Sequence, residues 1–171
     1  MPLFPAFEIG LWNAWIFMLY HQLLCTVLMG SKGLLMKSSA ATPHKNTGKK
    51  IVTFLGLIYY LALIYSVFLP LKLGTTWFYI GLPICLFGLI MYTMVTVNFA
   101  TAPLDEPVTK GLYRYSRNPQ YLTEFLMFIG VSIASASWIF LLFSIVYSIS
   151  MLSFASSEER FCLGKYGGCL S

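Results

Sequence analysis

Charged residues are scarce in this sequence of 171 residues, at 10%, and this scarcity argues against a soluble protein. A soluble domain averages about 25% charged residues. Apolar residues make up 58% of the chain, and the mean hydropathy is +0.75. We therefore expect an integral membrane protein whose surroundings are a lipid bilayer, and we expect no nucleic-acid partner.

The sequence also lacks the short motifs of several kinds of site. It contains no GxGxxG and no GxxxxGK[ST], so neither motif indicates a nucleotide-phosphate loop. The four cysteines show no CxxC or other metal-ligand spacing, and we expect no metal site. The first residues, Met1 to Pro5, lack a basic segment and a cleavage site, so we expect no removable signal peptide.

Apolar runs long enough to cross a hydrocarbon core of ~30 Å divide the chain into spans. The first three cover about residues 9–29, 51–69 and 77–99, and a longer run extends from Tyr121 to Ala155. As one helix the last run would be about 50 Å long, so we expect two helices that fold back near Ser135 to Trp138. The prediction is an all-α protein, a single domain over residues 1–171 with five transmembrane helices, the last two forming a helical hairpin.

The positions of Lys and Arg predict the orientation of these spans. With five spans and the N-terminus outside, ten of the 11 Lys and Arg residues lie on the inner side, and only Lys72 lies outside. The loop over residues 101–120 and the C-terminus are then both on the cytosolic face, where we expect the active site.

Few polar side chains lie at membrane depth, where such groups usually face other helices or a cavity. For His21 we expect an interhelical hydrogen bond. Glu124 follows Tyr121 by three residues on a similar helix face, and a carboxylate near a membrane segment is costly without a role. Gly81 and Gly88 are seven residues apart, so they share a face and let another helix approach closely.

One stretch concentrates polar groups, namely Gly-Leu-Tyr-Arg-Tyr-Ser-Arg-Asn-Pro-Gln-Tyr at residues 111–121. So many donors at the mouth of a membrane segment can hold a polar ligand, although anchoring among lipid headgroups is the alternative. The five-span topology places this stretch beside residues 156–160, because both lie at the ends of one hairpin. Arg117 can then pair with Glu158 or Glu159, or share a ligand with them. The alternative is that the acidic pair only marks where a helix meets water.

These two segments together resemble the membrane-embedded methyltransferase superfamily, which includes the isoprenylcysteine carboxyl methyltransferases and the phospholipid N-methyltransferases. Residues 111–121 fit the pattern G-x-Y-x-x-x-R-[HN]-P-x-Y. After an apolar hairpin, Glu158 and Glu159 and then Tyr166-Gly167 fit the second part of the pattern. The resemblance covers about residues 105–167.

The resemblance implies S-adenosylmethionine as cofactor, held by about residues 101–121 and 154–167. The expected catalytic residues are Arg117 and Glu159. An amine acceptor must lose a proton, so a carboxylate can act as base, with Glu159 as the candidate and Glu124 as the second. The implied cofactor-binding residues are Asp105, Glu106, Pro107, Val108, Tyr113, Asn118, Pro119, Gln120, Tyr121 and Glu158.

The substrate that the resemblance implies is a lipid-like molecule in the membrane, either an isoprenylcysteine carboxylate or a phospholipid amine. Phe154 stands where the carboxyl methyltransferases usually have an arginine, which leaves a neutral or cationic lipid head open. Two alternatives stay open at this point. Membrane sterol reductases have a similar C-terminal hairpin, so an NADPH-dependent reductase is one, and a small non-enzymatic membrane subunit is the other.

Overall fold

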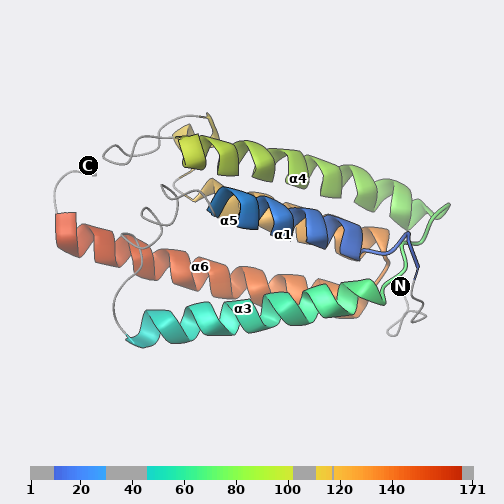
Figure 1. Ribbon diagram of the computed structural model, residues 1–171, viewed down its shortest axis with the longest axis horizontal. Helices are drawn as coiled ribbons and strands as arrows, with labels where there is room; N and C mark the ends of the chain where they lie inside the picture. The colour runs from blue at the N-terminus through green and yellow to red at the C-terminus, as the bar shows by residue number, and fades with distance from the viewer. Residues whose placement is uncertain (1–9, 30–45, 102–110, 117, 167–171) are drawn as a thin grey trace.

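The computed structural model describes residues 10–29, 46–101, 111–116 and 118–166, and these residues form an all-helical structure (Figure 1). Side chains are described for residues 10–27, 53–101, 111–116, 118–153 and 155. The elements are α1 (Trp15–Met29), α3 (Asn46–Val67), α4 (Thr76–Thr101), the 3-10 helix η1 (Gly111–Arg114), α5 (Pro119–Ala134) and α6 (Trp138–Tyr166). The all-α prediction is confirmed for this part of the chain.

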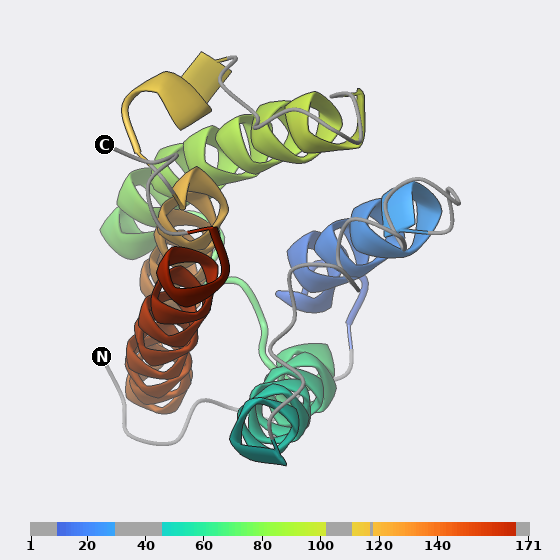
Figure 2. The same cartoon turned by 90° about the vertical axis from the view of Figure 1, so that its left-hand side faces the viewer.

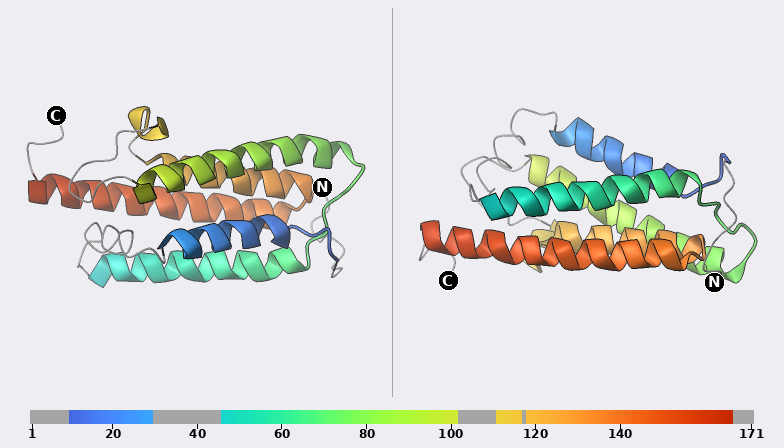
Figure 3. Two further views of the ribbon diagram at one scale, coloured as in Figure 1. Left: turned by 45° about the horizontal axis from the view of Figure 1, so that its top comes forward. Right: turned by 90° about the horizontal axis from the view of Figure 1, so that it is seen from below.

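The α-helices run up and down and contact one another in the order α4, α5, α6, α3, α1 and back to α4 (Figures 1 and 2). At one end lie the start of α1, the link between α3 and α4, and the turn between α5 and α6. We call this the turn end. At the other end, here called the motif end, lie η1, the start of α5 and the final part of α6 (Figure 3). With 29 residues, α6 is 13 residues longer than α5, which has 16, so it projects past the start of α5.

The first helix begins later than the apolar pattern predicts, at Trp15 rather than near residue 9. The backbone of residues 12–14 instead pairs with residues 69–71, through hydrogen bonds of 2.9 and 3.1 Å. The side-chain amide of Asn13 donates to the Val67 carbonyl at 2.7 Å, where α3 ends. The polar Asn13, predicted to lie within a membrane span, therefore belongs to a loop contact at the turn end.

Glycines allow α4 and α5 to pack with their backbones in contact. A Cβ added to Gly88 would stand 2.5 Å from the backbone nitrogen of Met127, and one added to Gly81 would overlap the backbone of Ala134. Gly130 on α5 faces the backbone of Cys85 in the same way. The predicted close approach of another helix to Gly81 and Gly88 is confirmed, and the partner is α5.

The chain reverses between Ala134 and Trp138, where the sequence predicts a turn. Ser132 before the turn and Ser144 after it join α5 to α6 in a buried contact, with their hydroxyls 3.1 Å apart. At the turn itself, the backbone N–H of Lys72 donates to the Ala134 carbonyl at 3.2 Å. This bond connects the α3–α4 link to the end of α5.

Within the described residues, one helix is long and apolar enough to cross a membrane, namely α4, with a mean hydropathy of 2.1 over its most apolar window. Shorter apolar segments lie in α1 (Trp15–Val27), α3 (Thr53–Val67) and α6 (Trp138–Ser153). The second helix begins before the apolar run that predicts it, since α3 starts at Asn46 and the run starts at residue 51.

Candidate functional site

The polar stretch at the motif end begins with a turn that requires glycine. Gly111 has a φ of +64°, and a Cβ there would overlap the side-chain amide of Asn98 on α4. This conformation starts η1 and brings Tyr113 against Phe99, with ring centroids 6.3 Å apart and planes 25° apart. Burial raises the pKa of Tyr113 to about 12, so its hydroxyl keeps its proton at neutral pH.

The next predicted residues start α5. Pro119 is the first residue of the helix and is buried, which suits proline because the first helical N–H has no partner within the helix. Asn118 precedes it without a side-chain hydrogen bond that caps the helix, and its backbone N–H faces the Ser116 hydroxyl at 3.4 Å. The side chain of Asn118 is half-buried and lines a groove.

Gln120 and Tyr121 point to different places. The amide of Gln120 lies 3.5 Å from the hydroxyl of Tyr92 on α4, so it turns toward the interior. Tyr121 lines the same groove as Asn118. Asn118 and Tyr121 therefore share a cavity. Gln120 and Tyr113, which are also predicted cofactor-binding residues, instead contact α4.

The groove lies between α5 and α6 and has a volume of about 630 Å³. Ser116 and Asn118 are at its polar end, and Ser148 lies farther along on α6. The rest of the lining is apolar or aromatic: Tyr121, Leu122, Phe125, Ile145, Ile149 and Leu152. Because Leu122, Ile149 and Leu152 are each more than half exposed, the groove opens sideways to the surroundings of the bundle.

Such a groove can bind an amphiphile or a small molecule with an aromatic part. Its volume is within the range of small-molecule sites, about 300–1,000 Å³. The ring of Tyr121 offers a face for a planar base or for a sulfonium cation, and the polar groups near Asn118 offer hydrogen bonds. These residues therefore fit S-adenosylmethionine or the head of a lipid at the polar end, and an alkyl chain beyond it.

The other predicted site residues cannot be placed with their side chains. Arg117 and the segment Asp105, Glu106, Pro107 and Val108 lie outside the described residues. Glu158 and Glu159 belong to α6, on the part that projects at the motif end, but their side chains are not among those described. The predicted contact of Arg117 with Glu158 or Glu159 remains a prediction.

A second polar set lies deeper, around Glu124. Its carboxylate is 3.1 Å from Nε2 of His21, and the Tyr147 hydroxyl donates to it at 3.0 Å. Nδ1 of His21 is 2.9 Å from the hydroxyl of Tyr59, so the interhelical hydrogen bond expected for His21 is confirmed. Sequence reasoning singled out Glu124 and His21 but neither their contact nor the role of Tyr147, because nothing in the spacing reports which helices are neighbours.

Comparison with known proteins supports the resemblance. Searches among curated proteins and among solved structures find no match for this chain. Residues 73–168 match the family model described as phospholipid methyltransferase, and they include the whole of α4, η1, α5 and α6. Because this match covers more than half of the sequence and contains both the groove and the motif that lines it, the chain belongs to the phospholipid methyltransferase family.

Proposed function

We propose that this protein is an S-adenosylmethionine-dependent methyltransferase of the membrane that methylates the amine head of a phospholipid. The observation that carries the proposal is the family match over residues 73–168, which includes the groove between α5 and α6. The cofactor supplies a methyl group on a sulfonium sulfur, which a nucleophile can take. A phospholipid amine is favoured over a prenylcysteine carboxylate because Phe154 replaces the arginine that the resemblance led us to expect for a carboxylate substrate.

The positions of the described residues support the following roles. Asn118 and Tyr121, which line the groove, hold the cofactor at its polar end. Tyr113 on η1, which packs against Phe99, is a further cofactor contact. The apolar wall over Phe125, Ile145 and Ile149 receives an acyl chain that enters from the side. The predicted catalytic pair Arg117 and Glu159, and the cofactor contact of Glu158, complete the site from the loop and from the projecting part of α6.

The same proposal includes the five-span topology, with the N-terminus outside and the motif end on the cytosolic face. Large apolar side chains are exposed on the outer faces of the helices, which suits contact with lipid tails. Examples more than half exposed are Leu23, Leu57, Ile64, Ile90, Leu142 and Ile149. The NADPH-dependent reductase and the non-enzymatic subunit are not favoured, because the matched family is one of methyltransferases.

Calorimetric titration of the detergent-solubilised protein with S-adenosylhomocysteine tests the cofactor site. The test compares Tyr121→Ala, which alters the groove, with Tyr115→Ala, whose side chain is 84% exposed in the same motif. An aromatic stack on a base is worth ~1–3 kcal/mol, so we expect Tyr121→Ala to weaken binding about 5- to 150-fold. Tyr115→Ala should bind as the unchanged protein does.

Further measurements identify the rest of the site and the substrate. Arg117→Ala and Glu158→Ala should also weaken binding of S-adenosylhomocysteine. Labelled methyl groups should pass to phosphatidylethanolamine and not to a prenylcysteine. The proposal fails if the unchanged protein does not bind S-adenosylhomocysteine, and binding of NADPH in its place would favour the reductase.

A further inference from the structure

All four tryptophans of the chain lie at the turn end, although they come from three separate segments. Trp12 precedes α1 and Trp15 starts it, Trp77 is the second residue of α4, and Trp138 is the first residue of α6 (Figures 1 and 3). The side chains of Trp12, Trp77 and Trp138 are 67%, 45% and 50% exposed. These three residues, which we call the tryptophan belt, therefore present large aromatic surfaces to the outside of the bundle.

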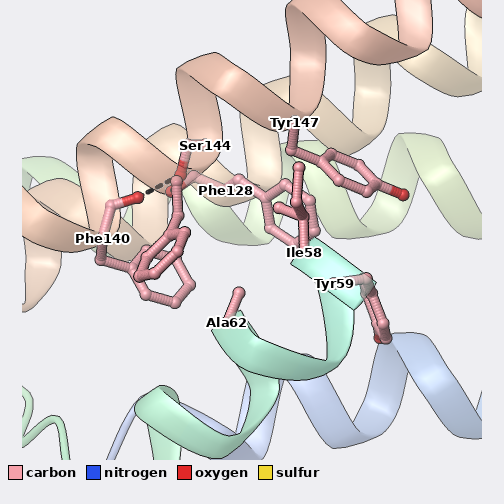
Figure 4. A pocket seen from close by; sticks show the side chains of 8 residues that line it. Ile58, Tyr59, Ala62, Phe128, Phe140, Ser144 and Tyr147 are labelled. Atoms are coloured by element: carbon pink, nitrogen blue, oxygen red, sulfur yellow. Dashed lines mark hydrogen bonds between the residues drawn. The ribbon is translucent and has the colours of Figure 1, made fainter. Parts of the chain in front are cut away.

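The interior of the bundle is filled by other aromatic residues. A cavity of only about 10 Å³ remains between α3, α5 and α6, and Figure 4 shows aromatic side chains from all three helices around it. They are Tyr59, Phe128, Phe140, Phe143 and Tyr147. Tyr92 on α4 also lies inside, with its ring centroid 4.5 Å from that of His21. No tryptophan lines this cavity, so packing of the core does not explain why the tryptophans gather at the turn end.

The indole side chain suits the boundary between hydrocarbon and water. Its rings are apolar, whereas its N–H group seeks a hydrogen-bond acceptor. Tryptophan is accordingly enriched where a membrane span meets the lipid head groups. Among the described residues of the turn end, Lys72 is the only Lys or Arg. Aromatic rings rather than charges are therefore the main candidates to anchor this end.

The two helices that start at the belt share one spacing to their first strongly polar residue. In α4, no charged, amide or imidazole side chain occurs between Trp77 and Asn98, which is 21 residues later. In α6, none occurs between Trp138 and Glu158, which is 20 residues later. At 1.5 Å per residue both distances are about 30 Å, which is the thickness of a hydrocarbon core. One bilayer therefore fits both helices, with the belt at one of its boundaries.

This fit also places the groove between α5 and α6. Gly88 of α4 faces the backbone of Met127 on α5, and the two helices run in opposite directions. Pro119, eight residues before Met127, is therefore level with Thr96, eight residues after Gly88. Because Thr96 precedes Asn98 by two residues, α5 begins close to the far boundary. The polar end of the groove is then near head-group depth, and its apolar wall lies within the hydrocarbon.

We propose that the tryptophan belt binds the head-group layer of the leaflet opposite the motif end and thereby fixes the depth at which the groove opens; this rests on the proposed five-span topology. The phosphates and ester carbonyls of phospholipids accept hydrogen bonds from the indole N–H groups, and the rings lie against the upper part of the acyl chains. Tryptophan is also enriched in contacts between proteins. Such a contact does not account for polar residues that begin about 30 Å away on two helices.

Quenching of the intrinsic tryptophan fluorescence tests the belt without any added label, because all four tryptophans lie at one end. The full-length protein is placed in phosphatidylcholine vesicles that carry bromine either near the head group or near the end of the acyl chain. We expect the shallow bromines to quench more strongly than the deep ones. Stronger quenching by the deep bromines overturns the proposal, and so does a lack of quenching by both.

Two reporter variants calibrate depth along α4. Tyr79→Trp adds a tryptophan beside the belt, and Phe87→Trp adds one ten residues after Trp77, about 15 Å away and near the middle of the bilayer. Tyr79 and Phe87 are 66% and 53% exposed, so both rings face outward. The fluorescence added by Tyr79→Trp should be quenched mainly by the shallow bromines, and that added by Phe87→Trp mainly by the deep ones. The same profile in both variants contradicts the assigned boundary.

Removal of the belt tests its role as an anchor. A variant with Trp12→Leu, Trp77→Leu and Trp138→Leu keeps apolar side chains and leaves Trp15 as the only tryptophan. In vesicles of long-chain lipids, which are thicker than the apolar segments, the turn end without its anchor should sink below the head groups. Deep bromines should then quench Trp15 more strongly than in short-chain vesicles, whereas the unchanged protein stays shallow in both. If Trp15 also stays shallow in the long-chain vesicles, the belt is not the anchor.

The test of the proposed function is separate, because calorimetry in detergent involves no bilayer. The belt variant should bind S-adenosylhomocysteine in detergent as the unchanged protein does. Weaker binding would mean that these tryptophans stabilise the fold rather than bind lipid, which overturns the proposal. Failure of the unchanged protein to bind S-adenosylhomocysteine instead contradicts the proposed function, while the quenching profile still decides on the belt.

Discussion

The close contact between α4 and α5 predicts that Gly88→Ala, which adds a single methyl group, lowers the free energy of unfolding. The added Cβ would stand 2.5 Å from the backbone nitrogen of Met127 and 2.9 Å from its Cα. Ordinary contacts between such atoms are about 3.5–4.0 Å, so the two helices must separate by about 1 Å. Backbone atoms cannot move aside by changing rotamer, and overpacking of this kind costs ~1–3 kcal/mol. Alanine regains ~1 kcal/mol of helix propensity, which leaves a net loss of up to ~2 kcal/mol in the free energy of unfolding.

Unfolding in mixed micelles with increasing sodium dodecyl sulfate, followed by circular dichroism, measures this loss. Gly56→Ala is the matched control, because Gly56 lies in α3 and a Cβ there meets nothing within 4 Å. It should raise the free energy of unfolding by up to ~1 kcal/mol through helix propensity alone. If Gly88→Ala proves as stable as Gly56→Ala, the reasoning about the α4–α5 contact is refuted.

Two further predictions concern the turn that carries η1. Gly111→Ala places alanine in a left-handed conformation, which costs ~1–2 kcal/mol, so calorimetry should show S-adenosylhomocysteine binding about 5- to 30-fold more weakly. Gly74→Ala is the control, because Gly74 has a similar φ of +76° but lies at the turn end, and it should leave binding unchanged. Burial raises the pKa of Tyr113 from 10.0 to about 12, so the unfolded chain loses this proton first, and the stability that Tyr113 contributes falls as the pH rises from about 10 to 12. An ultraviolet titration should show a phenol near pH 12 that Tyr113→Phe lacks; a titration curve that Tyr113→Phe does not change contradicts this assignment.

Regular features of the helices could be predicted from sequence because they depend on local patterns. The reversal near Ser135 follows from an apolar run too long for one bilayer, and the close approach at Gly81 and Gly88 follows from their spacing on one face. The motif around Asn118 and Tyr121 could be located because its residue types recur at fixed spacing in a known family. Each of these signals is contained within a short segment of chain.

Features that depend on contacts between distant segments could not be predicted. The start of α1 was placed too early because Asn13 lies in an apolar run, and its pairing with Val67 has no local signal. The meeting of His21 and Glu124 depends on how α1 sits against α5. The gathering of tyrosines around them depends on all five helices at once, and no periodicity along a single helix reports it.

The backbone hydrogen bonds at the turn end also bear on how the protein is made. Residues 12–14 leave the ribosome early, but their partners at residues 69–71 appear only after α3 is complete. The hydrogen bond from the Lys72 N–H can form only later, when its acceptor, the carbonyl of Ala134 at the end of α5, has been synthesised. The turn end therefore joins three segments that are synthesised at different times, namely residues 12–14, residues 69–72 and the end of α5. These contacts can all form only after α5, the fourth of the five described α-helices, has been made. A nascent chain that stops before residue 134 has no Ala134 carbonyl for the Lys72 N–H, so the hydrogen bonds of the turn end are complete only once α5 has been made.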